Sequence, residues 1–264
     1  MVKRLIQKGY IGLVIVFLYA PILVLMVLSF NGSKYRSKWG GFTFKWYREL
    51  LENEKILNAL WTTLLLALFS ALLATVLGTL AAVAMNRMKK LPKAIMMSIT
   101  NIPILNSEIV IGISMMLLYF AISFSLGFTS VLLALTAAHM PYVILNVLPK
   151  LRQTSRSTYE AALDLGASPI SAFFKIVLPD IFPGVLSGFM LAFTLALDDF
   201  VITHFTKDAK VSTLSTVIYS ETRRGIEPEI YALSTIMFTV VLVLLIVMNR
   251  MKASAAKKLA EQQK

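Results

Sequence analysis

The sequence predicts an all-α membrane protein that crosses the bilayer six times. Three observations lead to this prediction: 57% of the residues are hydrophobic, only 15% are charged, and the mean hydropathy is +0.74. A soluble domain has about 25% charged residues. The apolar residues also collect in runs of about 20, the length that a helix needs to cross the hydrocarbon core. We therefore expect a single transmembrane domain over residues 1–264, with lipid around its spans.

Uncharged runs place the spans along the chain. The predicted spans are residues 10–30, 57–85, 94–123, 129–148, 181–205 and 230–249. The first could be mistaken for a secretory signal, because Lys3, Arg4 and Lys8 precede it. Its apolar run is longer than the roughly 7–15 residues of a signal peptide, so we interpret it as an uncleaved span. The loop 31–56 is expected to contain a short amphipathic helix at the outer interface.

Basic residues favour one side of these spans. With the amino terminus inside, the inner segments hold 16 basic and four acidic residues, and the outer segments hold ten and seven. Because positive residues gather in cytoplasmic loops, both termini are predicted to be cytoplasmic. The net charge of +12 is thus typical of basic membrane loops and does not indicate a nucleic-acid-binding protein. The chain has no cysteine, which excludes disulfides and thiolate metal sites.

The segment 157–179, between the fourth and fifth spans, has the composition of two short helices joined by a tight turn. Ser157 and Glu160 fit a capping box at the first helix. Gly166 suits a left-handed helix end. Ser168 fits the N-cap of the second helix and Pro169 its first position.

Pro179 is expected to end that second helix, because proline cannot continue a helical hydrogen-bond ladder. The small side chains in this segment would let the backbone of another chain approach closely. On these features alone, an ordinary cytoplasmic hairpin is the alternative interpretation.

Seven residues of this segment stand at the spacing of a known motif, Glu-Ala-Ala, three residues, Gly, nine residues, Ile-x-Leu-Pro. They are Glu160, Ala161, Ala162, Gly166, Ile176, Leu178 and Pro179. The segment resembles the EAA loop of permease subunits from ATP-binding-cassette importers. The resemblance implies the type I importer permease fold, with cytoplasmic coupling helices that dock on an ATPase subunit. The residues that it places at this contact are Glu160, Ala161, Ala162, Asp164, Gly166 and Ala167.

The chain has no ATP-binding motif of its own. Nothing in it matches Gly-x-x-x-x-Gly-Lys-Ser/Thr, so a phosphate-binding loop is not expected. The sequence therefore predicts a transporter subunit and not an enzyme, with no catalytic residue, metal ligand or cofactor. ATP and Mg²⁺ would be bound by the partner ATPase.

Three acidic residues, Glu108, Asp198 and Asp199, fall inside predicted spans that offer no Lys or Arg to pair with them. An ionisable group in the membrane costs about 2.5–3.5 kcal/mol on insertion scales, so it indicates a functional site. Carboxylates along a permeation path suit a cationic substrate. The nearby aromatic residues Tyr119 and Phe200 could add cation–π contacts.

Other interpretations of these acids remain open. Adjacent helix positions point about 100° apart, so Asp198 and Asp199 cannot both face one path in a regular helix. One of them could cap a broken helix or pair with an Arg of a neighbouring subunit. The fifth span could also end near Leu197. Glu108 could be buried in its protonated form, hydrogen-bonded to Ser107 or Asn106.

The run Leu197-Asp198-Asp199-Phe200-Val201-Ile202-Thr203, in the fifth span after an EAA loop, resembles the polyamine-permease branch of this family. This resemblance implies an importer of spermidine and putrescine in the bacterial inner membrane. Its partners would be a homologous second permease, two ATPase subunits and a periplasmic polyamine-binding protein. The alternatives are an importer of another cationic or chelated solute, or a proton-coupled secondary transporter with Glu108 and Asp198 as relays. Secondary transporters usually contain internal repeats, and none is visible here.

Overall fold

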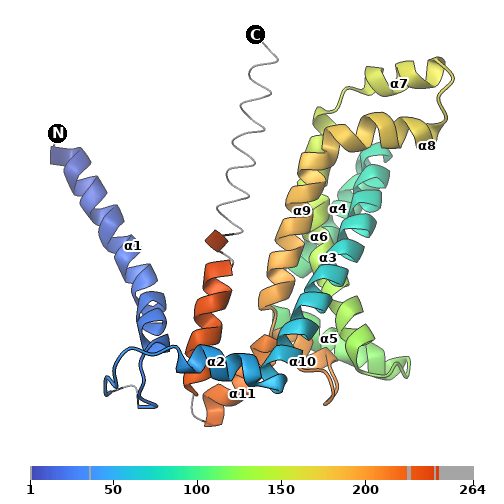
Figure 1. The fold of residues 1–264 in the computed structure, drawn as a ribbon. Helices are drawn as coiled ribbons and strands as arrows, with labels where there is room; N and C mark the ends of the chain where they lie inside the picture. The colour runs from blue at the N-terminus through green and yellow to red at the C-terminus, as the bar shows by residue number, and fades with distance from the viewer. Residues whose placement is uncertain (1, 36, 225–226, 241, 244–264) are drawn as a thin grey trace. The chain divides into compact units, whose positions relative to one another are not determined.

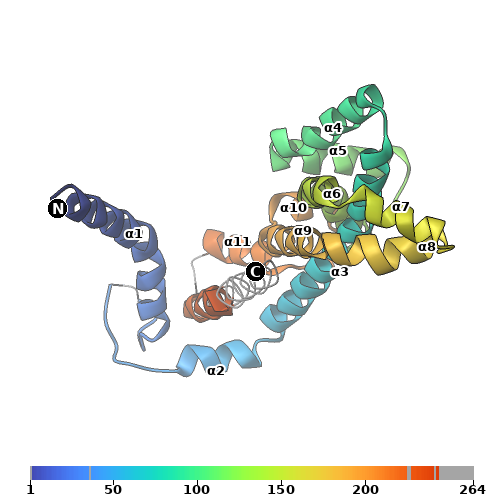
Figure 2. The same cartoon turned by 90° about the horizontal axis from the view of Figure 1, so that it is seen from above.

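The computed structural model describes residues 2–35, 37–224, 227–240 and 242–243. Within these ranges the regular structure is helical, apart from one isolated bridge between Asn31 and Phe42. The chain forms two compact units, one from residues 1–57 and 218–264 and the other from residues 58–217. Figures 1 and 2 show the helices of these units in two views.

The described residues contain four helices that are long and apolar enough to cross a membrane. They are Gly9–Ser29 within α1 (Val2–Ser29), α3 (Glu54–Arg87), α6 (Phe128–Gln153) and the helix Pro169–Asp198. A fifth arises if α4 (Lys90–Leu105) and α5 (Glu108–Ala121) count as one bent span. Residues 230–240 and 242–243 of the predicted sixth span are helical, and its remainder lies outside the described residues.

The predicted third span is wrong as a continuous helix. The helices α4 and α5 are bent by 106° relative to each other at Asn106 and Ser107, both of which are extended. The backbone N–H of Asn106 donates to the carbonyl of Ile102 at 3.1 Å, and its side-chain Nδ2 donates to the same oxygen at 3.0 Å. Side chains of this type end helices because they compete for backbone hydrogen bonds. Glu108 therefore begins α5 instead of lying mid-helix.

The predicted fifth span is wrong at its start, whereas its end agrees with the alternative that the span stops near Leu197. α8 (Pro169–Ala172) runs through a π-helical turn, η1 (Phe173–Val177), into α9 (Leu178–Asp198), so Pro179 does not end the helix. The turn is closed by a hydrogen bond from the N–H of Leu178 to the carbonyl of Phe173. Such a wide turn accommodates a proline and bends the axis, and Figures 1 and 2 show the change of direction between α8 and α9. At the other end the span stops at Asp198, before the separate helix α10 (Val201–Thr206).

Three spans of the second unit meet at Val143 of α6, a fully buried side chain. A Cβ atom added to Gly78 of α3 would lie 2.9 Å from the Cβ of Val143, and one added to Gly188 of α9 would lie 3.0 Å from its Cα. One turn before Gly188, a Cβ on Gly184 would lie 2.9 Å from the carbonyl oxygen of Asn146. Small residues four apart let membrane helices approach at backbone distance. This packing joins α3, α6 and α9 into one block.

In the first unit, Asn31 organises the loop that follows α1. Its Oδ1 accepts hydrogen bonds from the backbone N–H groups of Gly40 (2.7 Å) and Ser33 (3.2 Å), and its Nδ2 donates to the carbonyl of Lys38 (2.9 Å). Trp46 of α2 (Lys45–Glu52) donates from Nε1 to the Asn31 carbonyl at 2.6 Å. The buried Trp46 and Leu50 lie on one face of α2, which confirms the predicted short amphipathic helix.

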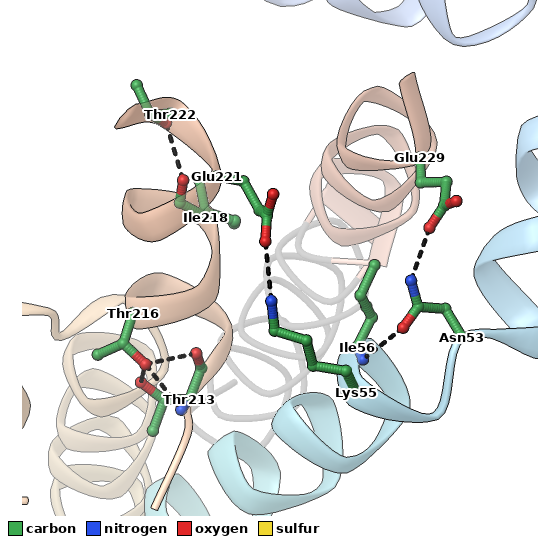
Figure 3. A network of polar contacts seen from close by, with 9 residues as sticks. All are labelled: Asn53, Lys55, Ile56, Thr213, Thr216, Ile218, Glu221, Thr222 and Glu229. Atoms are coloured by element: carbon green, nitrogen blue, oxygen red, sulfur yellow. Dashed lines mark hydrogen bonds and ion pairs between the residues drawn. The ribbon is translucent and has the colours of Figure 1, made fainter. Parts of the chain in front are cut away.

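Polar contacts join the start of α3 to residues near the carboxyl end of the described chain (Figure 3). The Nζ of Lys55 lies 2.8 Å from Oε1 of Glu221 in α11 (Leu214–Arg224). Asn53 donates from Nδ2 to Oε2 of Glu229 at 2.8 Å. At the start of α11, the N–H of Thr213 donates to the hydroxyl of Thr216 at 3.0 Å. The first two contacts connect the start of α3 to α11 and to Glu229, and the third lies at the start of α11.

The close approach at Val143 predicts the effect of a single methyl group. Gly78→Ala would place its Cβ within 3 Å of Val143, so we expect overpacking to lower the free energy of unfolding by about 1–3 kcal/mol. The measurement is thermal unfolding of the purified protein in detergent. Gly12→Ala in α1 is the control, because no atom lies within 4 Å of its added Cβ. Equal stability of the Gly78 and Gly12 variants would contradict the prediction.

Candidate functional site

The first helix of the segment 157–179 is α7 (Arg156–Asp164), and it begins earlier than predicted. Ser155 occupies the N-cap with extended backbone angles and makes no side-chain cap hydrogen bond. Ser157 lies inside the helix, and its hydroxyl is 2.6 Å from that of Ser155. The capping box predicted at Ser157 and Glu160 is therefore wrong, because the neighbouring serine takes the cap position.

The turn after α7 confirms the predicted role of Gly166, whose φ is +87°. The N–H of Gly166 donates to the carbonyl of Leu163 at 2.9 Å, and the N–H of Ala167 donates to the carbonyl of Ala162 at 3.0 Å. This pair of bonds is a Schellman motif. Ser168 then caps α8 as predicted, since its hydroxyl accepts from the N–H of Ser171 at 3.3 Å and Pro169 takes the first turn.

Three large apolar side chains of this loop are exposed, which the sequence did not lead us to expect. Leu165 is 90% exposed, Ile170 is 73% exposed and Phe174 is 60% exposed. Glu160, Ala161 and Asp164 are exposed beside them, whereas Ala162 and Ala167 are half-buried. Exposed large apolar side chains of this kind are typical of a surface that another protein covers. These three residues were not predicted for such a surface, although apolar side chains around Gly166 were the available signal.

At the opposite end of α9, Asp199 is 7% exposed and holds the backbone. Its carboxylate accepts hydrogen bonds from the N–H of Ile202 (3.3 Å), the N–H of Thr203 (2.8 Å) and the hydroxyl of Thr203 (2.7 Å). It therefore caps α10, which confirms the interpretation that one acid of the pair caps a broken helix. The positive end of the helix dipole also stabilises a carboxylate in this position.

Asp198 and Glu108 are exposed, and they lie near Asp199. Glu108 is close enough to both aspartates for their charges to interact. The helices account for this proximity: a Cβ on Gly112, one turn after Glu108 in α5, would lie 3.4 Å from the carbonyl oxygen of Val201 in α10. The three carboxylates thus gather where α5, α9 and α10 meet.

The acidic cluster, Glu108, Asp198 and Asp199, forms none of the ion pairs found among the described residues. Among the residues that the structure describes, no group of three or more His, Cys, Asp or Glu side chains is arranged to hold a metal ion. Two of the carboxylates, Asp198 and Glu108, are exposed. The cluster can therefore attract a cationic group without first breaking an internal pair.

The two aromatic residues predicted for the pathway differ in position. Tyr119 is buried, and its hydroxyl donates to the carbonyl of Ser130 at 2.8 Å, so it packs inside the unit in place of facing an open path. Ser130 in turn donates to the carbonyl of Thr206 at 2.7 Å, which ties α6 to the end of α10. Phe200 directly follows the two aspartates, is half-buried, and stacks on His204 with ring centroids 5.2 Å apart.

The segment 157–179 and the acidic cluster lie at opposite ends of α9, as Figure 1 shows for α8 and α10. α9 has 21 residues, which at about 1.5 Å per residue is close to the roughly 30 Å thickness of the hydrocarbon core. The two sites are therefore separated by about one membrane thickness.

Comparison with known proteins identifies the family. Residues 74–261 match the model of the binding-protein-dependent transport system inner membrane component. The chain belongs to this family. It is a permease component of a transport system and not itself an enzyme, as the sequence predicts.

Relatives match along most of their length. The chain is 37% identical to the spermidine/putrescine transport system permease protein PotC of Escherichia coli (strain K12), over 93% of each chain. It is 39% identical to the putrescine transport system permease protein PotI of the same organism, over 83% of this chain and 81% of PotI.

Solved structures have the same fold. A bacterial ABC transporter involved in the import of alginate matches with a TM-score of 0.73 and 18% identity, covering 95% of this chain and 94% of that one. The MetNI methionine ABC transporter matches with a TM-score of 0.59 and 20% identity, covering 75% and 95%. At these identities the likeness shows an ABC transporter permease fold and nothing about substrate.

The left-handed turn at Gly166 predicts a strain that does not depend on packing. An added Cβ would meet no atom within 4 Å, so Gly166→Ala tests the backbone alone. We expect it to lower the free energy of unfolding by about 1–2 kcal/mol, the cost of a left-handed conformation for a residue with a Cβ. Gly166→Asn should lose less, because asparagine tolerates this conformation. Equal unfolding midpoints for wild type and Gly166→Ala would contradict the prediction.

The two aspartates are predicted to differ in how much they contribute to the free energy of unfolding of the protein. Asp199→Ala leaves the backbone N–H groups of Ile202 and Thr203 without their acceptor and should cost about 1–3 kcal/mol. Asp198→Ala removes an exposed side chain, so its effect should stay within about 0.5 kcal/mol. Chemical or thermal unfolding of both variants in detergent measures the difference. Equal losses would show that Asp199 does not hold the α9–α10 junction.

Proposed function

We propose that this chain is a permease subunit of an ATP-driven importer of polyamines, of the spermidine and putrescine type, in the bacterial inner membrane. The observation that carries the proposal is the 37% identity to PotC over 93% of the chain. The likeness to PotI, a putrescine transport permease, supports the same substrate class. Both termini and the segment 157–179, which we call the coupling segment, would face the cytoplasm, in agreement with the distribution of basic residues.

The acidic cluster supplies the chemistry that a polyamine requires. Polyamines carry ammonium groups separated by alkyl chains, and carboxylates form strong charge-assisted hydrogen bonds with such groups. Asp198 and Glu108 are exposed and would bind the ammonium groups. Asp199 would hold the backbone between α9 and α10 in place. The half-buried Phe200 beside them could add a cation–π contact.

The coupling segment would join this subunit to its energy source. The exposed Leu165, Ile170 and Phe174, with Glu160, Ala161 and Asp164 beside them, would seat in a groove of an ATPase subunit. The full importer would contain a homologous second permease, two ATPase subunits and a periplasmic polyamine-binding protein. That binding protein would deliver the substrate at the acidic end of α9.

The length of α9 links the two sites mechanically. ATP binding would bring the ATPase subunits together and move the two coupling segments with them. Because η1 continues directly into α9, a displacement of the coupling segment would tilt or shift α9 and hence move Asp198 at its far end. ATP hydrolysis would then reset the path. Chemistry would take place in the ATPase, and this chain would contribute binding and motion.

Uptake of labelled solutes tests the substrate class and the coupling. We expect radiolabelled spermidine and putrescine uptake to be lost in cells without this chain and restored by its re-expression. Uptake of phosphate, iron and amino acids should be unchanged. Rescue of another solute would replace the polyamine assignment, and uptake that persists without ATP while the proton gradient is kept would favour a secondary transporter.

Two neutral substitutions test the acidic cluster. Asp198→Asn and Glu108→Gln should each lower polyamine uptake about tenfold or more, because a hydrogen bond to a charged group contributes about 1.5–3 kcal/mol. Glu52→Gln is the control, since it neutralises an exposed carboxylate on α2 that is not part of the cluster. Uptake is measured at equal amounts of membrane-inserted protein. Full uptake by both variants would remove the cation-binding role of the cluster.

A further inference from the structure

A polar contact joins the coupling segment to a span that is not adjacent to it in sequence. Arg87, the last residue of α3, donates from Nη2 to the hydroxyl of Tyr159 at 3.0 Å. The guanidinium carbon also lies 5.3 Å from the centre of the Tyr159 ring. The same cation therefore uses both the hydroxyl and the π system of one side chain. Tyr159 lies in α7, directly before Glu160.

The position of Tyr159 divides α7 into two faces. Consecutive helix positions point about 100° apart, so Tyr159 and Glu160 cannot serve the same surface. Tyr159 is half-buried and reaches α3, whereas Glu160, Ala161 and Asp164 are exposed. One face of α7 is thus available to a partner, and the other carries a contact to the transmembrane block.

The chain itself connects the coupling segment to α6 and α9. α6 leads into the segment through Thr154 and Ser155, and η1 leads out of it into α9. α3 has no such covalent link. It packs on α6 at Gly78, nine residues before its end, and the Arg87–Tyr159 contact lies at the end itself.

We propose that Arg87 and Tyr159 are positioning residues through which the coupling segment sets the position of the adjacent end of α3 during transport. The inference rests on the proposed function, because it assigns a role within an ATP-driven cycle. Packing at Gly78 fixes α3 nine residues before its end, whereas the hydrogen bond and the ring contact fix the position of the end itself. The contact is solvent-exposed, so water can replace it when it opens, and it can re-form in each cycle.

Coupling can be measured on the whole importer in proteoliposomes that contain this chain, the second permease and both ATPase subunits, with polyamine-loaded binding protein. Uptake and ATP hydrolysis are followed in the same vesicles for Arg87→Gln, Tyr159→Phe and the double variant. Arg152→Gln is the matched control, because Arg152 is an exposed cation in the last turn of α6. Co-purification of the ATPase subunits reports whether docking is intact.

We expect each single variant to lower the uptake per ATP hydrolysed about threefold, while the ATPase subunits co-purify in normal amounts. The double variant should lose no more than the worse single variant, because the two residues act through one contact. Arg152→Gln should keep the normal ratio. Tyr159→Phe keeps the ring, so its loss should be the smaller one.

Four outcomes would overturn the inference. An unchanged ratio in both single variants, or additive losses in the double variant, would show that the residues do not act together in coupling. A parallel loss of uptake, hydrolysis and co-purified ATPase would show a purely structural role. A wild-type complex without ATP-dependent polyamine uptake would overturn the proposed function and this inference with it, whereas normal coupling in wild type and variants overturns this inference alone.

Discussion

The close approach of three helices at Val143 is the constraint on which the second unit depends. Gly78 and Gly188 bring α3 and α9 to backbone distance on either side of this side chain. Within lipid, such contacts gain dispersion energy and not a hydrophobic driving force, so tight fit matters more than apolar area. The segment 157–179 leads into one end of α9, and the acidic cluster lies at its other end.

Interrupted helices create the acidic cluster. Asn106 and Ser107 end α4, and Asp199 separates α9 from α10, so the three carboxylates lie at helix ends and not along helix faces. Backbone groups freed at such interruptions must find partners if they lie within the membrane. The Asp199 side chain supplies acceptors for α10, and its carbonyl accepts a hydrogen bond from the Ser215 hydroxyl at 2.8 Å. The site and the local backbone therefore depend on the same residues.

Sequence patterns predicted the features that depend on local chemistry. Apolar runs located helices at the first, second, fourth and fifth spans, and Gly166 and Ser168 took the backbone roles that their chemistry requires. Hydropathy could not reveal the break at Asn106, because two polar residues hardly change the mean of a 30-residue apolar run. Pro179 was misjudged since a π turn, which depends on the preceding turn's geometry, removes the steric conflict. The Gly78–Val143 contact joins residues far apart in sequence, and no periodicity within one helix indicates it.

The adjacent aspartates show why neighbouring charges need not share a role. Asp199 is buried and accepts three hydrogen bonds, so most of the roughly four acceptor sites of its carboxylate are already used by the protein. Asp198, in contrast, is exposed. A regular helix would have pointed the two side chains about 100° apart and left one of them facing lipid or packed helices. Ending the helix between them resolves this conflict: the second aspartate stabilises the break, and the first stays exposed, as Glu108 does.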